Sequence, residues 1–207
     1  MNITINSKPV HAAQETFANL EEVLVNLSNT SLPEDHLVGV VRVNGNEFSE
    51  NYPGQAKEIT VNSVENLEVT TVSLQNFTYA AISDSMVFMG TIVKSINETA
   101  GLYRIYDETE ANEHFSNLMD PLRAMFQFID LTRSTTQWNF DKSTLKGQTL
   151  RHEWDRLHEI IDEIKATQEE NDWILMADLL EYELVPSVGR WIEIFAAKSL
   201  ELKKNIH

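Results

Sequence analysis

The hydrophobic pattern of this chain changes its period near residue 73. Before that point, short apolar runs alternate with polar residues, as in half-buried strands, and one helical segment is inserted among them. From Leu74 onward, apolar residues recur every three or four positions, as in amphipathic helices. Strands followed by a run of helices predict an α+β protein with two domains, residues 1–73 and residues 74–207.

The first part predicts two strands, a helix and then further strands. The dipeptide Asn44-Gly45 is the strongest local signal, because it tolerates the positive φ angles of a tight hairpin turn. The other boundaries follow from alternation and from turn residues. The expected strands lie at residues 3–5, 9–12, 37–43, around 48, 59–61 and 67–71, and the expected helix runs from an N-cap at Thr16 to about Asn29.

Two segments of this first part resemble a ubiquitin-like β-grasp domain. They are "VGVVRVNGNEF" at 38–48 and "ITVNSVENLEVTTV" at 59–72, taken with the order of the elements around them. Within that superfamily they are most similar to the small sulfur-carrier proteins of thiamine and molybdopterin synthesis. The resemblance implies a β-grasp fold for about the first third of the chain.

The sulfur-carrier chemistry does not follow from this resemblance. In those proteins the last strand runs into a terminal Gly-Gly, whereas here it runs into Val72-Ser73-Leu74 and the chain continues. The resemblance therefore implies a scaffold, of the kind whose sheet face or edge strand docks a protein partner.

The second part predicts four long helices with short connections, which favours an antiparallel four-helix bundle. The first helix carries apolar residues on both sides, as in a central helix or a helix at a subunit interface. The last helix contains Pro186, and we expect a bend there because proline lacks an amide donor and crowds the carbonyl four residues earlier. The expected helices cover residues 75–97, 108–134, 143–167 and 171–204.

The composition disfavours several classes of partner. The chain has 32 acidic and 16 basic residues, and its net charge of −16 would repel nucleic-acid phosphates and anionic lipid headgroups. The weakly charged run 74–93 holds too many polar residues for a membrane span, and the opening segment lacks the pattern of a signal peptide. There is no cysteine, which excludes disulfides and Cys-based zinc sites and favours a cytoplasmic location.

The sequence predicts a non-catalytic protein without a cofactor. It contains no Gly-x-Ser-x-Gly, no Gly-rich phosphate-binding loop and no His-Glu-x-x-His. A di-iron carboxylate site would require Glu-x-x-His on two helices, and the chain offers Asp155-x-x-His158 instead. No metal site is therefore predicted.

One carboxylate, Glu181, falls on the flank of an apolar stripe in the last helix. A carboxylate in such a position needs a cation or several donors, and His158 and Arg123 are the expected partners. Two interpretations remain open. Glu181 is either part of a ligand-binding site with His158 and Asp84, or a member of a structural ion pair. Glu183 points away from that flank, so the two glutamates are not expected to form a catalytic pair.

Trp138 and Phe140 lie in the loop before the third helix. An exposed Trp-x-Phe loop could anchor a protein partner, and the alternative is that it folds back and caps the end of the bundle.

The favoured function is a protein–protein interaction module, acting as an adaptor, a chaperone or a regulatory subunit. The apolar first helix suggests a homodimer formed through the helical domain, or the capture of an amphipathic partner helix. The alternatives are a small-ligand or metal-binding helical bundle and, by analogy at the level of the fold alone, a chaperone for secreted or flagellar proteins.

Overall fold

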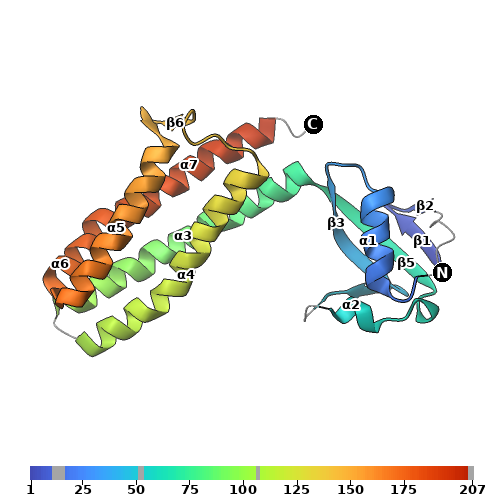
Figure 1. The fold of residues 1–207 in the computed structure, drawn as a ribbon, viewed down its shortest axis with the longest axis horizontal. Coiled ribbons are helices and arrows are strands. Elements are labelled where there is room, and N and C mark those ends of the chain that lie inside the picture. The colour runs from blue at the N-terminus through green and yellow to red at the C-terminus, as the bar shows by residue number, and fades with distance from the viewer. Residues whose placement is uncertain (11–16, 51–53, 106–107, 205–207) are drawn as a thin grey trace. The chain divides into compact units, whose positions relative to one another are not determined.

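The computed structural model describes residues 1–10, 17–50, 54–105 and 108–204. The chain forms two compact units, Met1–Phe77 and Thr78–His207. The first contains a mixed sheet with one long helix, and the second is mostly helical (Figure 1). The prediction of an α+β protein is confirmed. None of the helices that the structure describes is long and apolar enough to cross a membrane.

The first unit is built on a five-stranded sheet in the order β2-β1-β5-β3-β4. β1 pairs parallel to β5, and the remaining neighbours pair antiparallel. Helix α1 (Leu20–Thr30) packs against this sheet through Leu20, Val23 and Leu27, which are buried with apolar side chains of β1 and β5 (Figure 1). The strands are β1 Asn2–Ile5, β2 Lys8–Val10, β3 His36–Val43, β4 Asn46–Phe48 and β5 Asn66–Ser73.

The Asn44-Gly45 turn joins β3 to β4 as the sequence predicts. Asn44 and Gly45 have φ angles of 51° and 83°. The Asn44 side chain also accepts the amide protons of Glu65 and Asn66, at 2.8 and 3.0 Å, which ties the hairpin to the start of β5. The predicted cap at Thr16 lies outside the described residues, and the observed N-cap of α1 is Asn19.

The predicted strand at 59–61 is wrong. The chain there forms the short helix α2 (Gln55–Glu58) and a 3-10 turn, Val61–Ser63, with one isolated bridge between Thr60 and Asn19. Ile59 and Val61 still pack against the core of the first unit, but they do so from a turn. Two apolar residues in alternation are too short a pattern to distinguish a strand from a turn.

The helical unit differs from its prediction in three of the four helices. The first continues to Arg104, whereas it was predicted to end at 97. The third begins at Leu150 rather than 143, after a small hairpin whose turn residues Lys146 and Gly147 both have positive φ. The fourth is divided into three parts. The elements are α3 Leu74–Arg104, α4 Glu108–Thr135, β6 Thr144–Leu145, β7 Gln148–Thr149, α5 Leu150–Glu170, α6 Trp173–Asp178, a π-helix Leu179–Leu184 and α7 Val185–Lys204.

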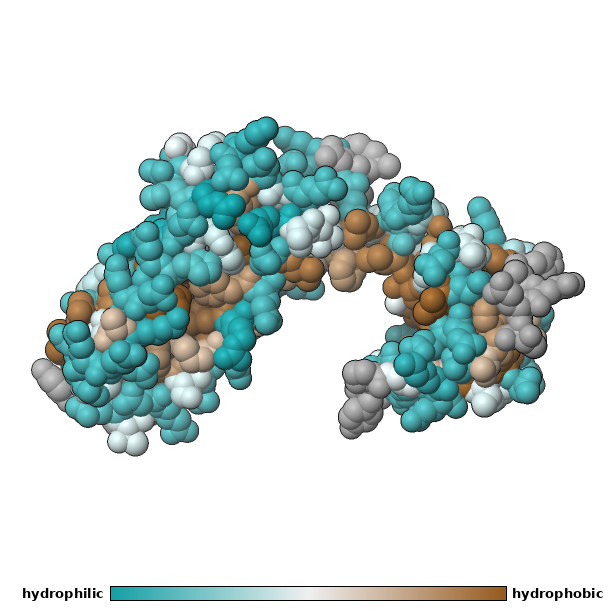
Figure 2. All heavy atoms as spheres, in the orientation of Figure 1, coloured by the Kyte–Doolittle hydropathy of each residue, from teal (hydrophilic) through white to brown (hydrophobic). Residues whose placement is uncertain are grey.

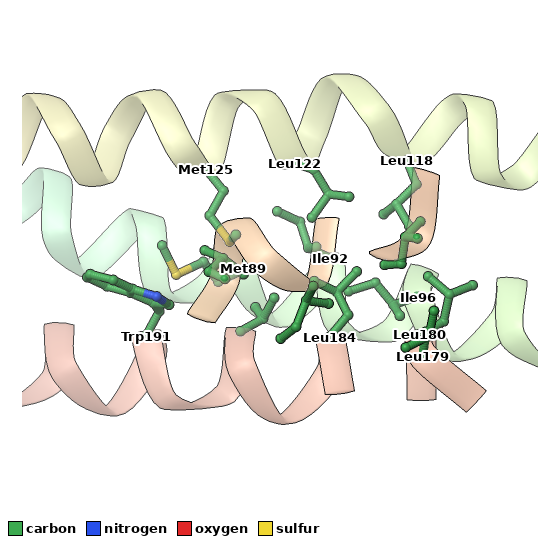
Figure 3. Packing of buried hydrophobic residues seen from close by; sticks show 14 of the residues in the cluster. Met89, Ile92, Ile96, Leu118, Leu122, Met125, Leu179, Leu180, Leu184 and Trp191 are labelled. Carbon is green, nitrogen blue, oxygen red and sulfur yellow. The ribbon is translucent and has the colours of Figure 1, made fainter. Parts of the chain in front are cut away.

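The core of the second unit forms where the apolar stripes of its long helices pack against one another. Figure 3 shows side chains of α3, α4, the π-helix and α7 pointing toward one another. Trp191 is fully buried at one end of the group drawn there. Residues of α5, among them Leu157 and Ile160, belong to the same core. This burial supplies most of what keeps the helices together.

Pro186 lies where the π-helix returns to an α-helix. In a regular α-helix its ring would crowd the carbonyl of Tyr182. In the widened turn that precedes it, the amide of Val185 bonds to the carbonyl of Leu180, five residues earlier. The structure therefore accommodates the proline through a π-turn, where the sequence had predicted only a bend.

Candidate functional site

Glu181 pairs with Arg104, near the end of α3, and not with His158 or Arg123. Arg104 Nη1 donates to Glu181, and Nη2 donates to Asp178 at 2.9 Å. The hydrogen bond to Asp178 is the main reason that the pKa of Arg104 is raised. All three charged side chains are partly exposed, so the cluster links α3 to the end of α6 and to the π-helix through ion pairs of modest strength.

Glu183 pairs with a different helix. Arg156 of α5 donates from Nη2 to Glu183 at 2.7 Å and lies near Glu159 and Glu163 as well. The hydrogen bond to Glu183 is the main cause that raises the pKa of Arg156. Glu181 and Glu183 therefore bind arginines of different helices and do not share one face.

Asp84, the third member of the possible ligand-binding site, is exposed on α3. It lies twenty residues before Arg104 on the same helix, which separates it from the Glu181 cluster by about 30 Å. His158 lies elsewhere again, on α5, where its ring contacts Phe126 and Trp154. The structure therefore does not bring Glu181, His158 and Asp84 together. Among the described residues, no group of three metal-ligating side chains is close enough to hold an ion.

Trp138 and Phe140 pack onto the helical core. Phe140 is buried, and its ring lies 5.7 Å from that of Trp191 and 5.6 Å from that of Trp138. Trp138 is half-buried, with the ammonium of Lys198 5.2 Å above its ring. Phe140 is thus inaccessible to a partner. Of the two alternatives, a partner-binding loop and a loop that folds back onto the bundle, the second agrees with the observed contacts.

Glu153, the most buried carboxylate among the described residues, was missed by sequence reasoning. Its side chain is 9% exposed, and Arg190 of α7 donates from Nε to its Oε2 at 2.6 Å. A signal was present, because Glu153 lies three residues after Leu150 and four before Leu157, both on the apolar stripe of α5. Trp154, the next residue, is half-buried and lies at the edge of that stripe.

Two polar atoms in the core have no hydrogen-bond partner within the described part of the chain. They are Ser187 Oγ and Trp191 Nε1, one turn apart on α7. An unbonded buried polar atom is costly, by about 1–3 kcal/mol, and such atoms are few in native proteins. Both lie in the first two turns of α7, which follows the π-helix Leu179–Leu184.

The N-terminal half of α3 carries an exposed apolar surface, which Figure 2 shows as brown side chains along this helix. Val87 is 72% exposed and Phe88 is 39% exposed. Of the apolar residues on the two sides of this helix, Met89 and Ile92 are buried within the chain, whereas Phe88 is exposed. We call this region the α3 surface, and its exposed residues are Ala80, Asp84, Val87, Phe88 and Thr91.

Residues 81–194 match the family described as Domain of unknown function (DUF8042), and this match spans more than half of the chain. The chain belongs to the DUF8042 family. Residues 2–72 match a second family, described as Domain of unknown function (DUF8043). No curated protein and no solved structure matches the chain. The DUF8042 match begins within α3 and ends within α7, so it includes Val87, Arg104 and Glu153.

Proposed function

We propose that this member of the DUF8042 family is a non-catalytic protein–protein interaction module, which binds a partner helix on the α3 surface. The observation that supports it is the exposure of Val87 and Phe88 on a helix face with almost no charge. Between Leu74 and Val93 the only charged residue is Asp84, although 23% of the whole chain is charged. An exposed helix face is ordinarily polar, and contiguous exposed apolar residues are typical of interaction sites.

The charge of the chain defines the chemistry of the partner. A net charge of −16, with Asp84 in the middle of the surface, favours a partner helix whose apolar stripe is flanked by lysine or arginine. Two copies of so acidic a chain repel each other, which makes a second copy the less favoured occupant. An adaptor, a chaperone or a regulatory subunit would each use such a surface.

The first unit fits this proposal as a β-grasp scaffold beside a four-helix bundle. The strand order β2-β1-β5-β3-β4, with β1 and β5 parallel, supports the β-grasp assignment. Its edge strands β2 and β4 have three residues each, which limits pairing with a further strand. A cytoplasmic location is part of the same proposal, supported by the lack of cysteine.

A synthetic helix tests the α3 surface directly. The probe is a fluorescent peptide of about 20 residues with leucine at helical spacing and flanking lysines, and its counterpart carries glutamates in place of the lysines. We expect fluorescence anisotropy to show binding of the lysine peptide that Val87→Glu weakens by about tenfold or more. Leu200→Glu is the matched control, because Leu200 is also an exposed apolar residue, on α7, and the charge change is the same.

Equal binding by the Val87→Glu and Leu200→Glu variants would exclude the α3 surface as the binding site. Light scattering distinguishes a partner helix from a second copy of the chain as the occupant of the α3 surface. For the protein alone we expect a mass near the 23.7 kDa of one chain. A mass of twice that value, reduced by Val87→Glu alone, would replace the partner helix with a second copy.

A further inference from the structure

A groove of about 320 Å³ lies between α4 and α5, away from the α3 surface. Its apolar part is formed by Leu122 and Phe126 of α4 and by Ile161 of α5. Leu122 is buried and the other two are half-buried, so the groove reaches the edge of the hydrophobic core. Its volume is at the lower end of the range for small-molecule sites, about 300–1,000 Å³.

His158 is fixed in the wall of this groove with one ring nitrogen directed to the backbone. Its Nδ1 lies 2.9 Å from the carbonyl oxygen of Trp154. A carbonyl oxygen can only accept, so Nδ1 carries a proton in either charge state of the ring, and Nε2 is the nitrogen left for a ligand. The ring is held between the rings of Trp154 and Phe126, with centroids 4.5 and 5.0 Å away.

Two further cationic side chains, Arg123 and Lys165, border the groove. Each also contacts an aspartate three residues away on its own helix: Arg123 binds Asp120 at 2.8 Å, and Lys165 binds Asp162 at 3.2 Å. These pairs are exposed and weak, and a guanidinium has donors to spare for a second acceptor. The groove lining thus holds Arg123, Lys165 and a histidine against one carboxylate, Asp162, in a chain whose acidic residues outnumber its basic ones two to one.

We propose that this groove binds a small amphipathic carboxylate. The hydrocarbon part of the ligand lies on Leu122, Phe126 and Ile161. Its carboxylate accepts hydrogen bonds from the guanidinium of Arg123 and lies against Nε2 of His158, the ring nitrogen that the backbone carbonyl leaves open. This binding site is independent of the α3 surface and of the proposed interaction with a partner helix, so either can fail without the other.

The full chain is titrated with decanoate, below the concentration at which decanoate forms micelles, and with decan-1-ol, which has the same hydrocarbon chain without the charge. Calorimetry measures affinity, and NMR of ¹³C-methyl methionine locates the ligand. Met119 lines the groove and Met176 is buried in the core outside it, so we expect the Met119 methyl signal to shift and the Met176 signal to stay. Met119→Leu assigns the signal.

Arg123→Gln removes the guanidinium and His158→Gln removes the imidazole, and we expect each to weaken the binding of decanoate by about tenfold. His152→Gln is the matched control, since His152 is exposed on the same helix but does not line the groove, and its affinity should equal that of the parent. Decanol should bind more weakly than decanoate and be insensitive to Arg123→Gln.

Three results would each overturn the proposal. They are the lack of decanoate binding up to about 1 mM, decanoate binding that leaves the Met119 signal unchanged, and equal affinities for decanoate and decanol. Circular dichroism of each variant checks its folding, and Arg123 is exposed enough that its replacement should leave the fold intact.

Discussion

The ion pair between Glu153 and Arg190 predicts a large and specific effect on the stability of the helical unit. The carboxylate side chain is 9% exposed and the arginine side chain 39% exposed, and the two atoms in contact are 2.6 Å apart. Among the described residues Arg190 is the only ion-pair partner of Glu153. Arg190→Met keeps an unbranched apolar stem on α7 and leaves the buried carboxylate without its cation.

Breaking a buried ion pair by removing one partner costs about 3–5 kcal/mol. Water reaches the arginine end of this pair, so we expect Arg190→Met to lower the free energy of unfolding by about 2–3 kcal/mol. Glu153→Leu leaves behind a cation that is already partly solvated, and it should cost about 0–1 kcal/mol. The double variant buries no charge and should lie within about 1 kcal/mol of the parent. The coupling between the two sites is then about 3 kcal/mol.

Tryptophan fluorescence in a urea titration is the suitable assay. All four tryptophans lie in the unit Thr78–His207, so the signal follows the unfolding of the helical unit. If the double variant is as unstable as Arg190→Met alone, the cost does not come from an unpaired carboxylate, and the reasoning fails. A loss below about 0.5 kcal/mol for Arg190→Met would show that Glu153 is as well solvated as a surface residue.

Three further predictions concern side chains of the same unit. Burial raises the pKa of Tyr103 to about 12 from its ordinary 10.0, so its stabilising contribution is complete below pH 10 and is lost as the pH rises to about 12. Between pH 10 and pH 12 the parent should therefore lose about 2–3 kcal/mol of its free energy of unfolding through this tyrosine, and Tyr103→Phe should not show that loss. Urea titrations at the two pH values measure the difference. Glu181→Gln should cost only about 0.5–1 kcal/mol, and a cost that does not shrink between about 0.1 M and 1 M salt would contradict a partly exposed ion pair. Ser187→Ala should be neutral or stabilising by about 1 kcal/mol, whereas destabilisation on thermal unfolding would show that the hydroxyl is hydrogen-bonded to a buried water.

Local patterns were sufficient for much of the fold. The change of period near residue 73 predicted a strand-rich part followed by helices, and β5 ends at Ser73 where α3 begins at Leu74. The Asn44-Gly45 turn was predicted correctly because positive φ is a property of the residues themselves. The small hairpin before α5 was not predicted, because Lys146-Gly147 is a weaker turn signal and its strands have two residues each.

The partners of the candidate site residues could be predicted from the sequence to a lesser degree than the fold. The sequence showed that Glu181 needs a cation, but its helical spacing could not say that the cation is Arg104, which is 77 residues away along the chain. The sequence suggested that His158 pairs with Glu181, whereas the structure places the His158 ring in a groove with Arg123.

By itself, the sequence determined most of the elements, much of the apolar side of each helix, and the presence of a proline inside the last helix. These are properties of neighbouring residues, and they follow from periodicity and backbone sterics. Only the tertiary structure decided which helices face each other, that Pro186 follows a π-turn, and that Glu153 is buried against Arg190. These depend on contacts between residues far apart in the chain, which form only when all the apolar stripes are buried at the same time.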